Sequence, residues 1–169
     1  MISNLKSLLF GTRPFQVKSD FDIKDSVLRL NDAVSSFSVS TLFKEKLVGH
    51  VRENHVVLRR ERPHIQNSFK PFLDASFIEE DGCVYLKGEY RMSRPTQIFM
   101  VFWFGFIAFW ELMVISKLQL DNPKYYLFIL AGLVMLGFGV LLIKFGAKLA
   151  SNDISWINSK VTKALKNGA

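Results

Sequence analysis

The chain has 169 residues, of which 49% are hydrophobic and 22% charged, and its 22 Lys and Arg against 15 Asp and Glu give a formal net charge of +7. This length allows one ordinary domain, and the single cysteine, Cys83, excludes an internal disulfide. Basic and acidic residues are interleaved along most of the chain, which argues against nucleic acid as a partner.

The N-terminal segment, residues 1–19, carries apolar residues at loosely helical spacing until a glycine and a proline interrupt them. This pattern predicts either a short helix on the surface of the domain or membrane, or a poorly ordered tail. A clearer helical period follows, and Asp20 and Asp22 are placed to cap its start. It predicts an amphipathic helix that ends near Val34 and needs a flat partner.

Strand-like alternation of apolar and polar residues predicts that partner. The alternating runs are residues 47–51, 56–62, 69–79 and 83–92, and residues 37–43 offer a further one. Asp81-Gly82 is a strong hairpin turn signal between the third and fourth runs. A meander of four or five antiparallel strands, with the helix on its apolar face, is a stable two-layer arrangement. We expect it to form a cytoplasmic domain over residues 20–96.

Two apolar runs, residues 97–116 and 125–144, dominate the second half of the chain. A bilayer core about 30 Å thick needs roughly 20 predominantly apolar helical residues. A short polar loop with an Asn-Pro turn signal separates the runs. Residues 97–146 are therefore expected to form a two-helix transmembrane hairpin, which makes the fold class membrane α+β.

Residues 147–169 are predicted to form a C-terminal amphipathic helix that starts at Ser151-Asn152-Asp153. Two positions stay open for it, packed on the sheet or lying on lipid as a basic anchor. Lysines are frequent after the second apolar run, whereas the loop between the runs has only Lys117 and Lys124. The positive-inside rule then places both termini in the cytoplasm.

Glycines recur every seven residues along the second predicted helix of the hairpin, at Gly132, Gly139 and Gly146. Small residues let helix backbones approach closely in lipid, and Gly105 and Ala108 offer a matching patch on the first run. We expect helix packing within the hairpin, with a contact between copies of the chain as the alternative.

Glu111 is a carboxylate inside the first apolar run. An intramembrane charge is a functional candidate by default. Glu111 lies close to the end of its run, however, so its side chain can reach the interface or pair with Lys124. The interfacial interpretation is favoured over a proton or ion pathway.

A basic strand suggests a ligand site. Arg59, Arg60 and Arg62, joined by Lys70, could bind a phosphate or an anionic lipid headgroup, although Glu61 between them favours a solvated strand face. The spacing of His50, His55 and His64 does not predict a metal site. The sequence has no recognisable phosphate loop, nucleophile motif or carboxylate pair, so no cofactor and no catalysis are expected.

A segment with an Asn-Ser-Phe-x-Pro core, residues 62–72, is followed by residues 86–91 and 99–105. Over roughly residues 45–110 the chain resembles a group of uncharacterised bacterial membrane proteins that place a small β domain before a transmembrane hairpin and a short C-terminal helix. The resemblance implies this architecture and no activity. Within the core segment, four residues are candidates for a loop that contacts a partner: Asn67, Phe69, Pro71 and Phe72.

These patterns predict a membrane-anchored, non-enzymatic binding or accessory module that docks a protein partner at the cytoplasmic membrane surface. The alternative is a ligand-sensing membrane effector that oligomerises through its hairpin and permeabilises the bilayer. The expected partners are membrane lipids and either a protein or further copies of the chain.

Overall fold

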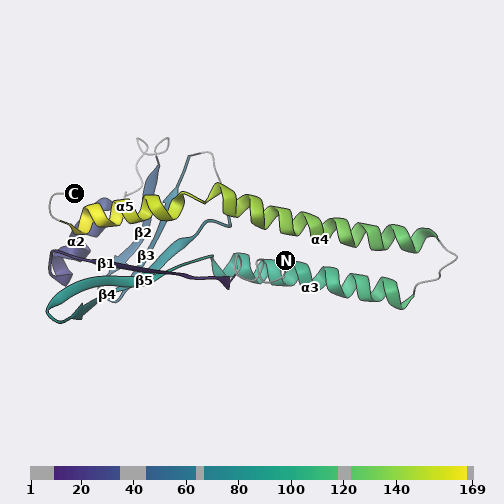
Figure 1. Cartoon of the computed structure of the whole chain (residues 1–169), viewed down its shortest axis with the longest axis horizontal. Coiled ribbons are helices and arrows are strands. Elements are labelled where there is room, and N and C mark those ends of the chain that lie inside the picture. Colours follow the sequence, from purple (N-terminus) through teal and green to yellow (C-terminus); the bar gives the residue numbers. More distant parts are fainter. Residues whose placement is uncertain (1–9, 35–44, 64–66, 118–122, 167–169) are drawn as a thin grey trace.

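The computed structural model describes residues 10–34, 45–63, 67–117 and 123–166. Within these residues the strands and helices follow in the order β1, α2, β2, β3, β4, β5, α3, α4 and α5 (Figure 1). Their bounds are β1 Arg13–Lys18, α2 Ile23–Ala33, β2 Lys46–Arg52, β3 His55–Glu61, β4 Phe72–Glu80, β5 Cys83–Arg91, α3 Arg94–Ser116, α4 Pro123–Leu149 and α5 Asp153–Leu165.

The strands form one five-stranded antiparallel sheet in the order β1-β5-β4-β3-β2. The last four strands make the expected meander. Asp81 and Gly82 both have positive φ, 51° and 69°, as the two central residues of a type I′ hairpin turn require. The predicted strand over residues 37–43 lies outside the described residues.

The edge strand β1 corrects the prediction for the N-terminal segment, because residues 13–18 form neither a helix nor a tail. They pair with β5, from Arg13 opposite Tyr90 to Lys18 opposite Tyr85. Phe15 alone among them is buried, and its ring meets the Tyr90 ring edge-on at 5.7 Å. Burial of this aromatic pair fixes the register of an otherwise polar strand.

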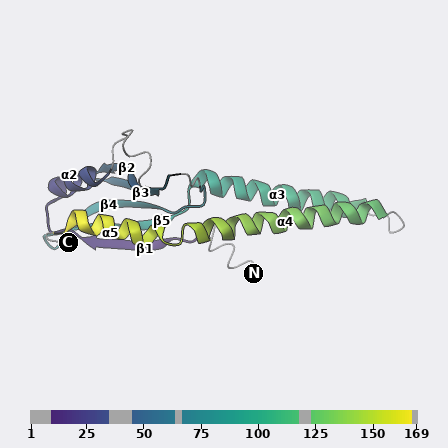
Figure 2. The same cartoon turned by 90° about the horizontal axis from the view of Figure 1, so that it is seen from above.

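Helices α2 and α5 cover one face of the sheet (Figure 2). Leu30 of α2 and Ile157, Val161 and Leu165 of α5 are fully buried, together with Leu58, Leu73 and Leu86 of the strands. Of the two predicted positions for the C-terminal helix, packing on the sheet is therefore confirmed. At the start of α2 the Asp22 side chain accepts a hydrogen bond from the Asp25 backbone N–H, as a helix cap does.

Helices α3 and α4 form an antiparallel pair that extends away from the sheet (Figure 1). Their 23 and 27 residues correspond to about 35 and 40 Å of helix, and both are long and apolar enough to cross a bilayer. Apolar side chains on their outer surfaces are exposed, among them Phe102 at 71% and Leu127 at 71%. A short break at residues 150–152 separates α4 from α5.

Candidate functional site

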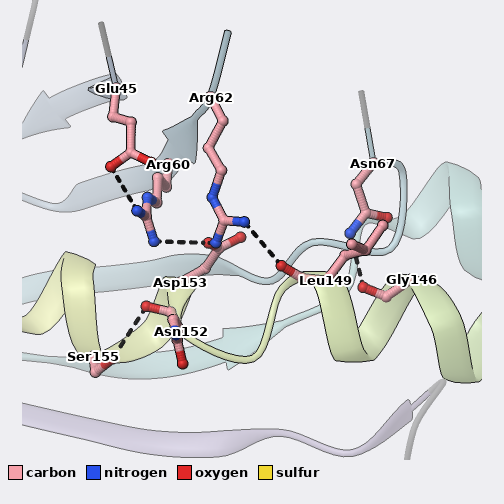
Figure 3. Close-up of polar contacts among 9 residues, drawn as sticks. All are labelled: Glu45, Arg60, Arg62, Asn67, Gly146, Leu149, Asn152, Asp153 and Ser155. Atoms are coloured by element: carbon pink, nitrogen blue, oxygen red, sulfur yellow. Dashed lines mark hydrogen bonds and ion pairs between the residues drawn. The ribbon is translucent and has the colours of Figure 1, made fainter. Parts of the chain in front are cut away.

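The predicted basic strand is divided by the alternation of β3. Arg60 points to the helix-covered face, where it is 9% exposed, whereas the Arg59 side chain lies on the opposite, open face and pairs with Glu61 at 3.1 Å. Arg62, just beyond β3, lies beside the start of α5 (Figure 3). The four predicted ligand-binding cations therefore do not form one cluster.

Arg60 and Arg62 meet at Asp153, the first residue of α5 (Figure 3). Arg60 donates to Asp153 Oδ1 at 3.3 Å and to Glu45 Oε2 at 2.6 Å, while Arg62 also donates to Asp153 Oδ1. Asp153 is 4% exposed, and a carboxylate in the first turn complements the helix dipole. Asp153 and Glu45 together balance the charges of the two guanidinium groups at this junction.

The same arginines fasten the break between α4 and α5. Arg62 donates a second hydrogen bond, at 3.0 Å, to the backbone carbonyl of Leu149, the last residue of α4. The Arg60 guanidinium lies 4.8 Å above the centre of the Trp156 ring on α5. Arg62 thus binds the end of one helix and the beginning of the next.

Two residues of the loop that was predicted to contact a partner pack against α4 of the same chain. Asn67 donates its side-chain N–H to the Gly146 carbonyl of α4 at 2.8 Å (Figure 3). Its side-chain oxygen accepts from the Phe69 backbone N–H at 2.9 Å. A Cβ on Gly146 would lie 2.6 Å from Phe69 Cδ2, so the ring occupies the space that glycine leaves. Pro71 and Phe69 both line a cavity beside the end of α4, and Phe72 lies beneath Arg91 at 5.4 Å. Asn67 and Phe69 therefore join the sheet domain to α4.

The other two glycines of the seven-residue series, Gly132 and Gly139, face α3. A Cβ on Gly132 would lie 1.7 Å from Glu111 Oε1, and one on Gly139 would lie 2.9 Å from Trp103 Nε1. Large side chains of α3 thus pack against small residues of α4, which agrees with the predicted packing within the hairpin. Gly105 behaves differently, since a Cβ there would meet nothing within 4 Å, and Ala108 is also exposed. The prediction that Gly105 and Ala108 match the glycine stripe is wrong.

Glu111 lies in this helix contact. Its Oε1 atom is buried against Gly132 and has no hydrogen-bond partner among the described residues. The prediction that Glu111 is an interfacial residue, which extends to the membrane surface or pairs with Lys124, stays a prediction, because the contact with Gly132 does not fix its depth in a bilayer. The indole Nε1 of Trp103, on the same face of α3, is likewise buried, and no described residue forms a hydrogen bond with it.

Arg59 and Lys70, the other two predicted cations, share an open cavity of about 480 Å³. It lies between the open face of β3, the segment before β4 and the first turn of α3. Its polar lining is Arg59, Ser68, Lys70, Ser93 and Thr96. Burial lowers the pKa of Lys70 and the Arg59 charge lowers it further, while Glu61 and Asp153 oppose this shift.

Histidines and other metal ligands do not gather in the part of the chain that the structure describes: no group of three or more His, Cys, Asp or Glu side chains occurs there. His55 lies 3.4 Å from Asp74, and His64 lies outside the described residues.

No protein-family model, curated protein or solved structure matches this chain. Its class therefore comes from its own architecture. The described residues form an α+β protein in which a five-stranded antiparallel sheet is joined to two long apolar helices that could span a membrane. Its most developed polar feature is the junction between them, formed by Arg60, Arg62, Asn67 and Asp153.

Proposed function

We propose that this protein is a membrane-anchored, non-enzymatic binding module that holds the open face of its sheet at the cytoplasmic surface of a bacterial inner membrane, where it docks a protein partner. The observation that carries the proposal is the direct attachment of the sheet domain to both long helices. Arg62 and Asn67 hydrogen-bond to α4, and Thr96 of α3 donates to the Ser68 carbonyl at 2.9 Å. This attachment would hold the sheet in a defined position beside the lipid.

The open face of the sheet, defined by Phe72, Asp74, Ser76, Tyr85, Lys87, Glu89 and Arg91, has a composition that suits protein binding. Aromatic side chains and arginine are enriched at protein interfaces. Here Arg91 lies 5.4 Å above the Phe72 ring and pairs with Asp74, while Lys87 lies 5.3 Å above the Tyr85 ring. These pairs supply both apolar area and orienting charge.

The proposed orientation rests on the cations at the sheet end of the hairpin. Arg94 precedes the apolar part of α3, and Lys144 and Lys148 are exposed near the end of α4. All three belong to the end of the hairpin that carries the sheet. Anionic cytoplasmic lipids attract such side chains, and the positive-inside rule favours them on that side.

A photo-crosslinking experiment tests the docking proposal. We expect a benzophenone amino acid in place of Tyr85, on the open face, to give one adduct of defined mass in native membranes, and mass spectrometry to identify a second protein in it. The same substitution at Leu28, which is 62% exposed on the outer side of α2, is the control and should give no such adduct. Lipid adducts alone at Tyr85, or equal adducts at both sites, would contradict the proposal.

The effector alternative retains one specific observation. Gly105 and Ala108 are exposed on the outer side of α3, where small residues would let another hairpin approach. If the hairpins oligomerise there, a Gly105→Leu change should convert a large particle in mild detergent to a small one, and light scattering coupled to size exclusion measures the difference. Gly137→Leu, at a position where a Cβ would also meet nothing within 4 Å, is the matched control. A small particle for the unaltered chain would remove this alternative.

A further inference from the structure

The cavity that holds Arg59 and Lys70 has the chemistry of an anion site. Two cationic side chains from different segments reach it, Arg59 from β3 and Lys70 from the turn before β4. The Lys70 backbone N–H donates to the Asn67 carbonyl at 3.5 Å, but among the described residues its side chain makes no hydrogen bond and no ion pair within 4.0 Å. The Arg59 side chain is half exposed, at 53%, and within the described part of the chain Glu61, at 3.1 Å, is the one carboxylate that it contacts. We propose that this cavity binds an anionic phosphate group.

The burial of Lys70 supports an anionic occupant. Moving an ammonium group partly out of water beside the guanidinium of Arg59 disfavours its charged form, which explains the lowered pKa of Lys70. A phosphate oxygen near Lys70 would reverse this cost, because an opposite charge within about 4–6 Å favours the charged form. Arginine complements it, since the guanidinium group can bind two phosphate oxygens at once.

The remaining lining adds polar groups without adding a carboxylate. Ser93 and Thr96 hydroxyls lie 2.7 Å apart, and Thr96 in turn donates to the Ser68 carbonyl, which fixes the shape of the wall. Ser93 is the residue before α3 and makes no side-chain cap to the helix. Pro95 has no backbone N–H and the Gln97 N–H bonds to the Ser93 carbonyl, so α3 contributes the positive end of its helix dipole at this wall rather than a set of free donors.

The position of the cavity suggests a lipid phosphate as its first source. It adjoins the polar first turn of α3, immediately before the apolar part that begins at Ile98. That is the level at which headgroup phosphates lie if the hairpin spans the bilayer. The lipid source rests on the membrane placement proposed above, whereas a soluble phosphate would need only the cavity.

Binding measurements on the full chain in neutral detergent separate these sources. The probes are monomeric dihexanoyl phosphatidylglycerol, dihexanoyl phosphatidylcholine as the zwitterionic control, and inorganic phosphate, each titrated by isothermal calorimetry. We expect one saturable site per chain for phosphatidylglycerol, and about a tenfold loss of affinity in Lys70→Gln, the size expected for one charged hydrogen bond. Arg59→Gln should reduce affinity in the same way.

Lys148→Gln is the matched control, because it removes the same charge from an exposed position at the same end of the hairpin but outside the cavity. Its affinity should stay unchanged, and circular dichroism should show that all variants are folded. Saturation by inorganic phosphate alone, still lost in Lys70→Gln, would support the cavity with a soluble phosphate as its source. Equal losses in Lys70→Gln and Lys148→Gln, equal binding of phosphatidylcholine, or no binding of any probe would overturn the proposal. None of these results depends on a protein partner.

Discussion

Replacing Asp153 by alanine is expected to lower the free energy of unfolding by about 3 kcal/mol, the size typical of removing one partner from a buried ion pair. Asp153 is 4% exposed and accepts hydrogen bonds from both Arg60 and Arg62. Its removal leaves Arg60 with Glu45 and Arg62 with the Leu149 carbonyl. Within the described part of the chain, Arg62 then remains partly buried with no carboxylate partner, and Arg60 keeps Glu45 alone.

Thermal unfolding in detergent micelles, followed by circular dichroism, measures this loss. For a chain of this size 1 kcal/mol corresponds to about 2–4 °C, so the midpoint should fall by roughly 6–12 °C. Asp32→Ala removes the same charge from an exposed position on α2 and should leave the midpoint almost unchanged. Equal midpoints for the Asp153 variant and the unaltered chain would show that the junction does not stabilise the fold.

Gly146→Leu is expected to separate the sheet domain from α4 and to cost about 1–3 kcal/mol, as overpacking does. The added Cβ would lie within 2.6–2.8 Å of three atoms of Phe69, including its Cβ, so the ring cannot escape by rotation alone. Moving the segment also strains the hydrogen bond from Asn67 to the Gly146 carbonyl. The sheet should then be less rigidly held on the hairpin.

Limited proteolysis between Pro63 and Pro71, together with the thermal midpoint, tests this effect. We expect faster cleavage and a lower midpoint for Gly146→Leu. Gly137→Leu is the control on the same helix, because a Cβ at that position meets nothing within 4 Å. If both variants are cleaved at the rate of the unaltered chain, the contact between Phe69 and Gly146 does not hold the segment in place.

Much of the fold could be predicted because its elements carry strong local signals. The period of α2, the Asp81-Gly82 turn and the two long apolar runs each identify their structure without tertiary information. Strand β1 carries no such signal. Its single buried residue, Phe15, is fixed by Tyr90 far along the chain, and helical spacing in the residues before it suggested another structure.

The candidate site was harder to predict, because a run of like charges in the sequence does not show on which face of the sheet each side chain lies. Alternation along β3 could have separated Arg60 from Arg59, since Val56, Leu58 and Arg60 share one face. The pairing of Arg62 with Asp153 spans 91 residues and leaves no local pattern. Likewise, nothing near Asn67 indicates that Gly146 is its acceptor.

Arg62 hydrogen-bonds both to Leu149 at the end of α4 and to Asp153 at the start of α5, so a tilt of one helix would be transmitted to the other. Helix α5 is about 20 Å long. If residues 150–152 between the helices stay rigid, a tilt of about 10° in α4 would move the C-terminal end of α5 by about 3 Å. The fully buried Ile157, Val161 and Leu165 would carry the sheet with it. In a bilayer of altered thickness, helices adjust by tilting. The angle between the sheet and the membrane surface would then depend on the thickness of the bilayer.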